Sequence, residues 1–298
     1  MIGILGTNPE SWRLHELRKV LVEREVEHKA LFPWLFSVDL LGGSPVTRYD
    51  GREIGPGEEL DLDIVYVASL GFRELPETLY KLWLLRELES DGIRIVNPVD
   101  TISMCRNKAD QSFQIIESGL KMPPTMITES VHLALEFIMD NRPCVLKPIT
   151  GLQGKGILMI PSGMEMGDVV DYVSWFQARY GKDVIYAQKY IEHPDYDIRA
   201  LVVGDEVLSK MRRVSEESWR TNISAGGIPV RSDEDIDSMA LEAARALNGE
   251  IVGVDILPSL DGEYYVLEVN AFPGWTGLQE VTDFSISEAV VDYLCSLL

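Results

Sequence analysis

Cysteine and histidine are scarce in this sequence, and their positions fit no common disulfide or metal pattern. The three cysteines, Cys105, Cys144 and Cys295, are far apart and odd in number, which argues against a disulfide framework and against a CxxC metal site. The four histidines show no HxxH-type spacing. No Ser-His-Asp or Cys-His arrangement is visible, so no nucleophilic catalytic residue is indicated.

Basic residues and long apolar runs are scarce as well. Lysine and arginine number 27 against 48 acidic residues, for a formal net charge of −21. Affinity for a polyanion comes largely from basic side chains, so we expect no nucleic-acid partner, and a local cluster of positive charge becomes informative. No apolar run approaches a membrane span in length, and the N-terminus lacks a charged-then-apolar signal sequence. These absences predict a cytoplasmic protein without a membrane partner.

The chain is long enough for an ample core and for two or three subdomains, with 298 residues of which 46% are hydrophobic. In roughly the first hundred residues, apolar strands such as "MIGILG" and "IVYVASLG" alternate with helical patterns such as "PETLYKLWLLRELES". This alternation predicts an open α/β unit, interrupted by a turn-rich hairpin at "TRYDGREIGPGEELD". The later strands "DIRALVVG" and "EVLSKMRRV" are expected to be antiparallel.

The apolar segment "VLEVNAFPGW" near the C-terminus carries two isolated polar residues, Glu268 and Asn270. Side chains alternate between the faces of a strand, so these two share one face. The other face is apolar and holds Tyr265, Leu267 and Val269. A half-buried surface strand would also show this pattern.

The segment upstream favours a metal site instead. "EIVGVDILPSLDGEYYVLEVN" predicts two strands joined by a type I′ turn at Asp261-Gly262, which places Asp255 opposite Glu268. A longer turn around Ser259 would shift this register. Like charges that face each other destabilise a sheet, whereas a divalent cation between them reverses the sign. Asp255, Glu268 and the side-chain oxygen of Asn270 form an all-oxygen set that suits Mg²⁺.

A glycine-rich stretch follows a charged residue in an apolar strand. In "VLKPITGLQGKGILMI", Lys147 leads into Gly151, Gly154 and Gly156. Glycines let the backbone approach phosphate oxygens and present amide groups to them. No GK[ST] opens a helix here, so the segment is not a P-loop, and it predicts a hairpin flap over phosphates. A plain hairpin turn is the alternative, but Lys147 in an apolar strand requires an anionic partner.

Four basic side chains gather in "KMRRVSEESWRTN", namely Lys210, Arg212, Arg213 and Arg220. A solvated face is the usual meaning of such a run, yet arginine clusters also bind carboxylate or phosphate in a bidentate manner. Strand alternation places Lys210 and Arg212 on one face and Arg213 on the other. Nearby, "PDYDIR" supplies Asp197 and Arg199, which either pair with each other or face a nucleotide.

Taken together, these motifs occur in the order seen in ATP-grasp ligases. Lys108, "LKP" with its Gly-rich loop, "QKYI", "DIRALVVG", "MRRV…WRTN…GG", "VDIL" and "LEVNAFPGW" resemble the RimK-like α-L-glutamate ligases and their coenzyme-modifying relatives, from about residue 97 onward. The resemblance implies an ATP-grasp fold of class α/β (α+β). Its parts would be an N-terminal α/β domain (1–98), a central subdomain with the flap (99–186) and a C-terminal subdomain with the metal hairpin (187–298).

The resemblance also implies roles for residues at matching positions. Phosphates would be held by Lys108, Lys147, Arg220 and Asn222, with the flap residues Gly151, Gln153, Gly154 and Gly156. The adenine hinge would be Gln188, Lys189, Tyr190 and Ile191, and the remaining nucleotide contacts Asp197, at the ribose, and Arg199. Catalysis would use Arg212, Arg213 and Arg220, and Mg²⁺, with Mn²⁺ as the alternative, would bind Asp255, Glu268 and Asn270. Relatives often have an acidic residue where Lys189 stands, so this sequence departs from the family pattern at that side chain.

The implied reaction is an ATP-dependent ligation. ATP would convert an acceptor carboxylate to an acyl phosphate, and the amine of L-glutamate would displace phosphate to form an amide. The favoured acceptor is a glutamyl-tailed or carboxylate-bearing coenzyme such as tetrahydromethanopterin. Alternatives are a ribosomal-protein C-terminus, an amino-group carrier protein, or a non-catalytic ATP-binding regulator. A homo-oligomer, dimer or tetramer, is expected.

Overall fold

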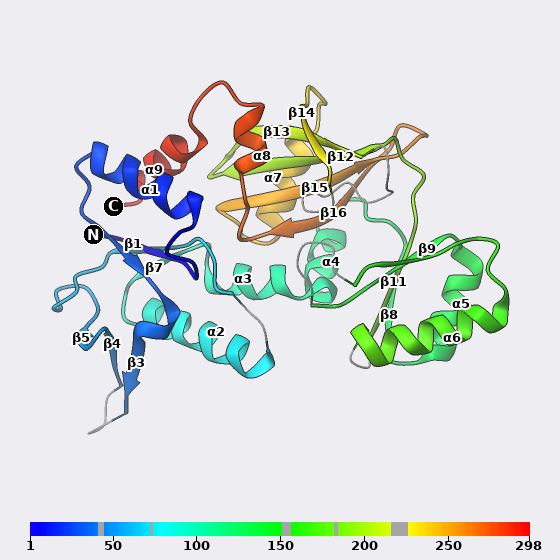
Figure 1. The fold of residues 1–298 in the computed structure, drawn as a ribbon, viewed down its shortest axis with the longest axis horizontal. Helices are drawn as coiled ribbons and strands as arrows, with labels where there is room; N and C mark the ends of the chain where they lie inside the picture. The colour runs from blue at the N-terminus through cyan, green and yellow to red at the C-terminus, as the bar shows by residue number, and fades with distance from the viewer. Residues whose placement is uncertain (41–44, 72–73, 151–155, 182–183, 216–225) are drawn as a thin grey trace.

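The computed structural model describes residues 1–298 except 41–44, 72–73, 151–155, 182–183 and 216–225. Within these residues it is a mixed α/β structure with four sheets, and the N-terminal strands and the central part lie toward opposite ends of the longest axis of the molecule (Figure 1). Within the described residues, no helix is long and apolar enough to cross a membrane.

The N-terminal part is the predicted open α/β unit. Its parallel sheet has the order β2-β1-β6-β7. The strands are β1 (Ile2–Leu5), β2 (His28–Leu31), β6 (Ile64–Val67) and β7 (Arg94–Val96). Helices α1 (Trp12–Glu23) and α2 (Leu75–Ser90) bury apolar faces against this sheet. The turn-rich insertion contains the predicted hairpin, formed by β4 (Val46–Tyr49) and β5 (Arg52–Glu53). Strand β3 (Phe36–Asp39), which follows η1 (Pro33–Leu35) and precedes the predicted stretch, extends the hairpin to a three-stranded antiparallel sheet.

The central part begins with two consecutive helices, α3 (Val99–Arg106) and α4 (Lys108–Glu117). A four-stranded antiparallel sheet of order β10-β9-β11-β8 follows. Its elements are β8 (Thr125–Thr128), α5 (Val131–Asn141), β9 (Cys144–Lys147), β10 (Leu158–Ile160), α6 (Met166–Phe176), η2 (Gln177–Gly181) and β11 (Ile185–Lys189). Strands β9 and β10 pair antiparallel on either side of the glycine-rich stretch, as expected for a strand–loop–strand unit. The expected boundary between residues 186 and 187 falls inside β11.

The C-terminal part is an antiparallel sheet of order β14-β13-β12-β15-β16. Its elements are β12 (Tyr196–Val203), β13 (Glu206–Val214), β14 (Ile228–Arg231), α7 (Asp237–Ala246), β15 (Ile251–Pro258) and β16 (Tyr264–Asn270). Helices α8 (Thr276–Glu280) and α9 (Ile286–Ser296) complete the chain. Helix α9 packs against α1, so the last helix lies beside the first and the two termini are close together (Figure 1).

The two faces of the C-terminal sheet bury different cores. On β12, Ile198, Ala200 and Val202 face the cluster around α7, whereas Leu201 and Val203 face the cluster shared with the N-terminal sheet. Alternation along the same strand places Asp197 and Arg199 on the face of Leu201 and Val203. One end of this otherwise apolar face is therefore charged.

The β15–β16 hairpin has the predicted pairing but not the predicted turn. Near the turn Pro258 pairs with Tyr264, and Ser259 N–H donates to the Glu263 carbonyl, so the loop has three residues with Gly262 at φ 86°. Such loops place glycine in the left-handed region after a type I turn. A bulge with Leu267 as the additional residue then shifts the register, and Asp255 still pairs with Glu268.

The bulge also corrects the expected distribution of side chains. Val266 and Val269, three residues apart, are both buried in the cluster that contains α7. Leu267 is only partly buried. The apolar face of β16 is therefore not made of Tyr265, Leu267 and Val269, because the inserted residue reverses the alternation between the turn and Glu268.

Candidate active site

The acidic face of the hairpin lies where β15 and β16 run side by side. Asp255 is directly opposite Glu268, and Asn270 is directly opposite Gly253. Gly253 has no side chain, and the Arg199 side chain fills the space above it. A Cβ atom at position 253 would lie only 2.8 Å from Nη1 of Arg199. The Arg199 guanidinium therefore passes over Gly253 to reach Asp255.

Two arginines neutralise the buried acids of this face. Asp255 accepts from Nη2 of Arg199 at 2.8 Å, from Nε of the same residue, and from Nη2 of Arg213 at 3.0 Å. Arg213 grips Asp197 in a bidentate pair at 2.7 and 2.5 Å. Burial alone would raise the pKa of Asp255, but Arg199 and Arg213 lower it below its usual value. The carboxylate is therefore ionised at neutral pH.

Asp197 and Arg199 do not pair with each other, one of the two possibilities raised by the sequence. In the antiparallel ladder Asp197 lies opposite Arg213, and Arg199 lies opposite Asp255. Each side chain thus has a partner of opposite charge directly across the strand pair, which is closer than a residue two positions along the same strand.

Lys108 at the start of α4 reaches the same face from another direction. Its Nζ donates to Oε2 of Glu268 at 3.1 Å. The Lys108 ammonium lowers the pKa of the Glu268 carboxyl. Burial opposes charge on Lys108, but Glu268 more than offsets it and the lysine pKa is raised. Both groups are therefore charged at neutral pH.

Lys147 at the end of β9 belongs to a hydrogen-bonded chain in the central sheet. Its Nζ donates to Oε1 of Gln188 at 2.6 Å, and Nε2 of Gln188 donates to the Tyr186 and Thr125 hydroxyls at 3.3 and 2.9 Å. The Tyr186 hydroxyl lies 2.9 Å from the hydroxyl of Ser112 in α4. Burial and the nearby Lys108 lower the pKa of Lys147 to about 8, although Glu268 and Asp255 act in the opposite direction.

These side chains form one charged cluster, in which four cations accompany three carboxylates. Its members are Lys108, Lys147, Asp197, Arg199, Arg213, Asp255 and Glu268. Figure 1 shows α4 between the central and C-terminal sheets, which supply the rest of the cluster. In a chain of net charge −21, this local excess of positive charge suits an anionic ligand.

Nucleotide binding at this cluster should therefore take up protons near pH 8. A phosphate beside Lys147 favours the ammonium form, so its pKa rises on binding and about half a proton per site is absorbed at pH 8. Calorimetry of ADP binding in buffers of different ionisation enthalpy measures this uptake.

Lys147→Ala should remove the uptake and weaken binding about tenfold or more, because a charge-assisted hydrogen bond is lost. Lys121→Ala is the matched control, since Lys121 is exposed and pairs with Glu263 at the far end of the hairpin. Unchanged affinity and unchanged proton uptake in Lys147→Ala would exclude a phosphate contact.

Lys210 and Arg212 lie on the opposite face of β13 from Arg213, as strand alternation predicted. Nζ of Lys210 donates to Asp237 of α7 at 2.8 Å. Arg212 pairs with Glu234, and its guanidinium carbon lies 4.6 Å from the centre of the Tyr196 ring. Arg212 is thus turned away from the charged cluster. Of the two arginines predicted to act on substrate and phosphate, only Arg213 lies in the charged cluster, because consecutive residues of a strand point to opposite faces.

Other predicted residues are placed less directly. Gln188 is buried and Lys189 is exposed. The backbone amides of Lys189 and Tyr190 donate to the carbonyls of Pro124 and Pro143 at 2.8 and 2.9 Å. Gly156 has a positive φ of 76° and lies against Pro148 and Tyr180. Five predicted residues lie outside the described part of the chain, namely Gly151, Gln153, Gly154, Arg220 and Asn222.

Three buried polar residues that support this site were not singled out from the sequence: Asn97, Gln111 and Ser112. Asn97 and Gln111 bond to the backbone of β15 and β16, and Ser112 bonds to Tyr186. The sequence offered one indication of their role. Gln111 and Ser112 follow Lys108 by about one helical turn, so they lie near it on the buried side of the same helix.

The acidic face offers the ligand atoms that a hard divalent cation prefers. Asp255, Glu268 and Oδ1 of Asn270 offer oxygen atoms, and both carboxylates are held ionised. Oδ1 of Asn270 also accepts from the Phe272 N–H at 2.9 Å. Among the residues that the structure describes, no group of three or more His, Cys, Asp and Glu side chains could hold a metal ion. A site with two carboxylates and one amide would leave coordination positions for phosphate oxygens and water, which fits Mg²⁺.

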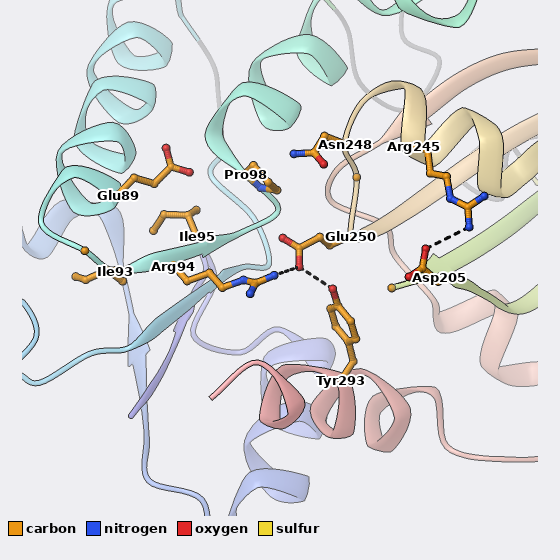
Figure 2. A pocket seen from close by; sticks show the side chains of 13 residues that line it. Glu89, Ile93, Arg94, Ile95, Pro98, Asp205, Arg245, Asn248, Glu250 and Tyr293 are labelled. Atoms are coloured by element: carbon orange, nitrogen blue, oxygen red, sulfur yellow. Dashed lines mark hydrogen bonds and ion pairs between the residues drawn. The ribbon is translucent and has the colours of Figure 1, made fainter. Parts of the chain in front are cut away.

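A separate cavity of about 650 Å³ lies at the other end of the C-terminal sheet, between β7, the β12–β13 turn, the start of β15 and α9 (Figure 2). Glu250 accepts from Nη2 of Arg94 at 2.8 Å and from the Tyr293 hydroxyl at 2.6 Å, and Arg245 pairs with Asp205 at 3.2 Å. Because Glu250 precedes β15 and Asp255 lies within it, this cavity is distinct from the charged cluster.

Comparison with known proteins agrees with this geometry. The tetrahydromethanopterin:alpha-L-glutamate ligase of Methanocaldococcus jannaschii is 33% identical over 78% of this chain and 79% of its own length. The protein of the same name from Methanococcus maripaludis is 35% identical over the same shares. The ATP-grasp ligase PsnB, solved with minimal precursor, Mg and ADP, superposes with a TM-score of 0.73 at 19% identity, covering 99% of this chain and 96% of that one.

A family model, the RimK-like ATP-grasp domain, matches residues 105–294. This range contains every member of the charged cluster, from Lys108 to Glu268. With the order of strands and helices and the similarity to the two methanogen ligases, it establishes that this chain belongs to the RimK-like ATP-grasp family.

Proposed function

We propose that this protein is an ATP-dependent carboxylate–amine ligase that adds L-glutamate to a carboxylate-bearing coenzyme acceptor such as tetrahydromethanopterin. The observation that carries the proposal is the meeting of Lys108 and Lys147 with the ionised pair Asp255–Glu268 at one cluster. The ATP-grasp fold implies binding of ATP and of a divalent metal ion. The names of the two methanogen relatives support the glutamate and pterin parts.

In the first step an acceptor carboxylate oxygen attacks the γ-phosphorus of ATP, and the bond to ADP breaks. The product is an acyl phosphate. Lys108 and Lys147 would bind phosphate oxygens and offset the charge that develops on them. Asp255, Glu268 and Asn270 would hold a Mg²⁺ ion, in preference to Mn²⁺, and the bound ion would supply positive charge that offsets the charge of the phosphates. Asp197 would bind the ribose, and the carbonyls of the 188–191 segment would contact adenine.

In the second step the glutamate amine attacks the acyl carbon, phosphate leaves and the nitrogen loses a proton. The amide, ADP and phosphate are the products. Arg213 and Arg199 would fix the orientation of a carboxylate or phosphate group near Asp255, because guanidinium groups bind such oxygens at two points. Within the described residues the cluster contains no Ser, Cys or His nucleophile, so the reaction depends on positioning and charge.

Incubation with ATP, Mg²⁺, labelled glutamate and a panel of acceptors tests the proposal. The panel holds a pterin coenzyme, a deazaflavin coenzyme with a glutamyl tail, a peptide ending in glutamate and an amino-group carrier protein. We expect a mass increase of one glutamyl residue on the pterin, with release of ADP rather than AMP. If only the peptide or only the carrier protein is labelled, that molecule is the acceptor instead of the coenzyme. ATP binding without any labelled product would indicate a non-catalytic regulator.

We also infer that the protein is a homo-oligomer, a dimer or a tetramer. Helix α2 exposes four large apolar side chains at helical spacing, namely Leu75, Leu79, Tyr80 and Trp83. Exposed apolar faces of this kind mark contacts with other chains. Light scattering coupled to size-exclusion chromatography measures the assembly, and a monomer at micromolar concentration would contradict the inference.

A further inference from the structure

Strand β16, which carries Glu268 and Asn270, is the last strand of its sheet. Among the described residues its outer edge faces no other strand. Groups from earlier in the chain bond to its backbone there instead. Val266 N–H donates to the Lys121 carbonyl at 2.9 Å, and the Ala271 carbonyl accepts from Nδ2 of Asn97 at 2.9 Å. Between these two contacts the Gln111 side chain bonds to the edge.

The Gln111 carboxamide bonds to Val269 at two points, as a neighbouring strand would. Nε2 donates to the Val269 carbonyl at 2.8 Å, and the Val269 N–H donates to Oε1 at 2.9 Å. Gln111 is buried, with 2% of its surface exposed. The two peptide groups that it holds are those that join Glu268 to Val269 and Val269 to Asn270. Their orientation determines where the side chains of Glu268 and Asn270 point.

The bulge at Leu267 interrupts the regular pairing with β15 just before this contact on the outer edge. The register changes between Ile256 and Asp255, directly before the segment that carries the acidic face. A slip by one residue moves every side chain of a strand to the other face. Pairing with β15 alone is irregular at this point, so a contact on the outer edge after the bulge selects the register that keeps Glu268 opposite Asp255.

The same helix connects this edge with the phosphate-binding side of the cluster. Lys108, one turn before Gln111 in α4, donates to Glu268, and Ser112, the next residue, lies 2.9 Å from the Tyr186 hydroxyl of β11. We propose that Gln111 is a positioning residue: it holds Glu268 and Asn270 in the geometry that binds the divalent ion and keeps them in register with Lys108. This inference rests on the proposed function.

Replacement of Gln111 by Met tests the proposal, because Met has a similar length and cannot bond to either Val269 group. We expect the Mg²⁺ concentration for half-maximal ADP binding to rise at least about tenfold, the usual effect of removing a residue that orients metal ligands. Calorimetry with ADP at several Mg²⁺ concentrations measures this without any acceptor. A merely structural glutamine would lower Tm but leave the Mg²⁺ dependence of the folded protein unchanged.

Gln114→Met is the matched control, since it makes the same change one turn further along α4 and no bond to β16 is lost. If Gln111→Met does not fold, Gln111→Asn provides the comparison, because its carboxamide is one methylene too short to reach Val269. Amide exchange in the unmodified protein adds a test that needs no variant: the Val269 N–H points away from β15, yet it should exchange slowly.

The outcomes separate this inference from the function on which it rests. If ADP binding by the unmodified protein does not depend on Mg²⁺, the metal assignment fails and the positioning role fails with it. If ADP binding depends on Mg²⁺ equally in the unmodified protein and in Gln111→Met, or if the Val269 amide exchanges as fast as an open edge, Gln111 has no positioning role while the proposed function stands.

Discussion

Glu268→Gln should reduce ligase turnover about a thousandfold and leave the fold intact, because loss of one charge from a metal site weakens the stabilisation of the transferring phosphoryl group. The Glu268 side chain is 34% exposed and accepts from Lys108. Glutamine occupies the same volume and retains an oxygen for that lysine. Turnover at saturating Mg²⁺ and circular dichroism of the folded protein are the measurements.

Asp255→Asn should also abolish turnover, but with a larger cost in stability. Asp255 is 3% exposed and is the partner of the buried Arg199. Loss of one charge from a buried ion pair costs about 3 kcal/mol of unfolding free energy, because the remaining charge is left without its counterion. Chemical denaturation therefore separates the two variants, and Glu268→Gln is the cleaner test of the metal site.

Glu263→Gln is the matched control for both variants. Glu263 belongs to the same hairpin but lies next to its turn, 48% exposed and paired with Lys121. We expect normal turnover and normal stability. Near-normal activity of both Glu268→Gln and Asp255→Asn in saturating Mg²⁺ would exclude the acidic face as the metal site.

Arg213→Lys should cause the second large loss, a fall in kcat of about tenfold or more together with about 2 kcal/mol of unfolding free energy, because lysine cannot replace a bidentate grip between charged groups. Arg213 is 4% exposed and bonds to both Asp197 and Asp255. A lysine ammonium reaches one of these carboxylates and leaves the other short of a partner. Steady-state kinetics and urea denaturation measure the two effects.

The neighbouring arginine is the natural control, since Arg212→Lys makes the same change on the opposite face of β13. Arg212 is partly exposed and pairs with Glu234. We expect kinetics close to those of the unmodified protein. Equal damage in both variants would mean that the segment acts through general stability, and full activity in both would mean that neither arginine contributes to the reaction.

Local patterns in the sequence predicted much of the architecture. Alternating strands and helices indicated the N-terminal α/β unit, and alternation along "KMRRV" separated Lys210 and Arg212 from Arg213. These predictions were correct because they depend on the period of a strand or helix, which neighbouring residues determine. The hairpin register was correct for a different reason, since a three-residue loop and a bulge together restored the predicted pairing of Asp255 with Glu268.

Partners across the fold could not be predicted in the same way. The sequence allowed Asp197 to pair with Arg199, but the order β13-β12-β15 placed Arg213 and Asp255 directly across from them. It also predicted that both Arg212 and Arg213 would act, whereas the structure places only Arg213 in the charged cluster. The pKa of Lys147, lowered to about 8, depends on its burial in the folded protein and on Lys108, which lies in a different element.

The sequence by itself determined which chemical groups this protein has. It has two carboxylates, Asp255 and Glu268, in one hairpin, lysines ahead of a glycine-rich stretch, and few basic residues elsewhere. Only the tertiary structure decided which of them meet. Helix α4 brings Lys108, Gln111 and Ser112 to three different partners, namely Glu268, Val269 and Tyr186. The physical reason is that side-chain type and local period are encoded residue by residue, whereas contacts between distant segments depend on how complete helices and sheets pack together.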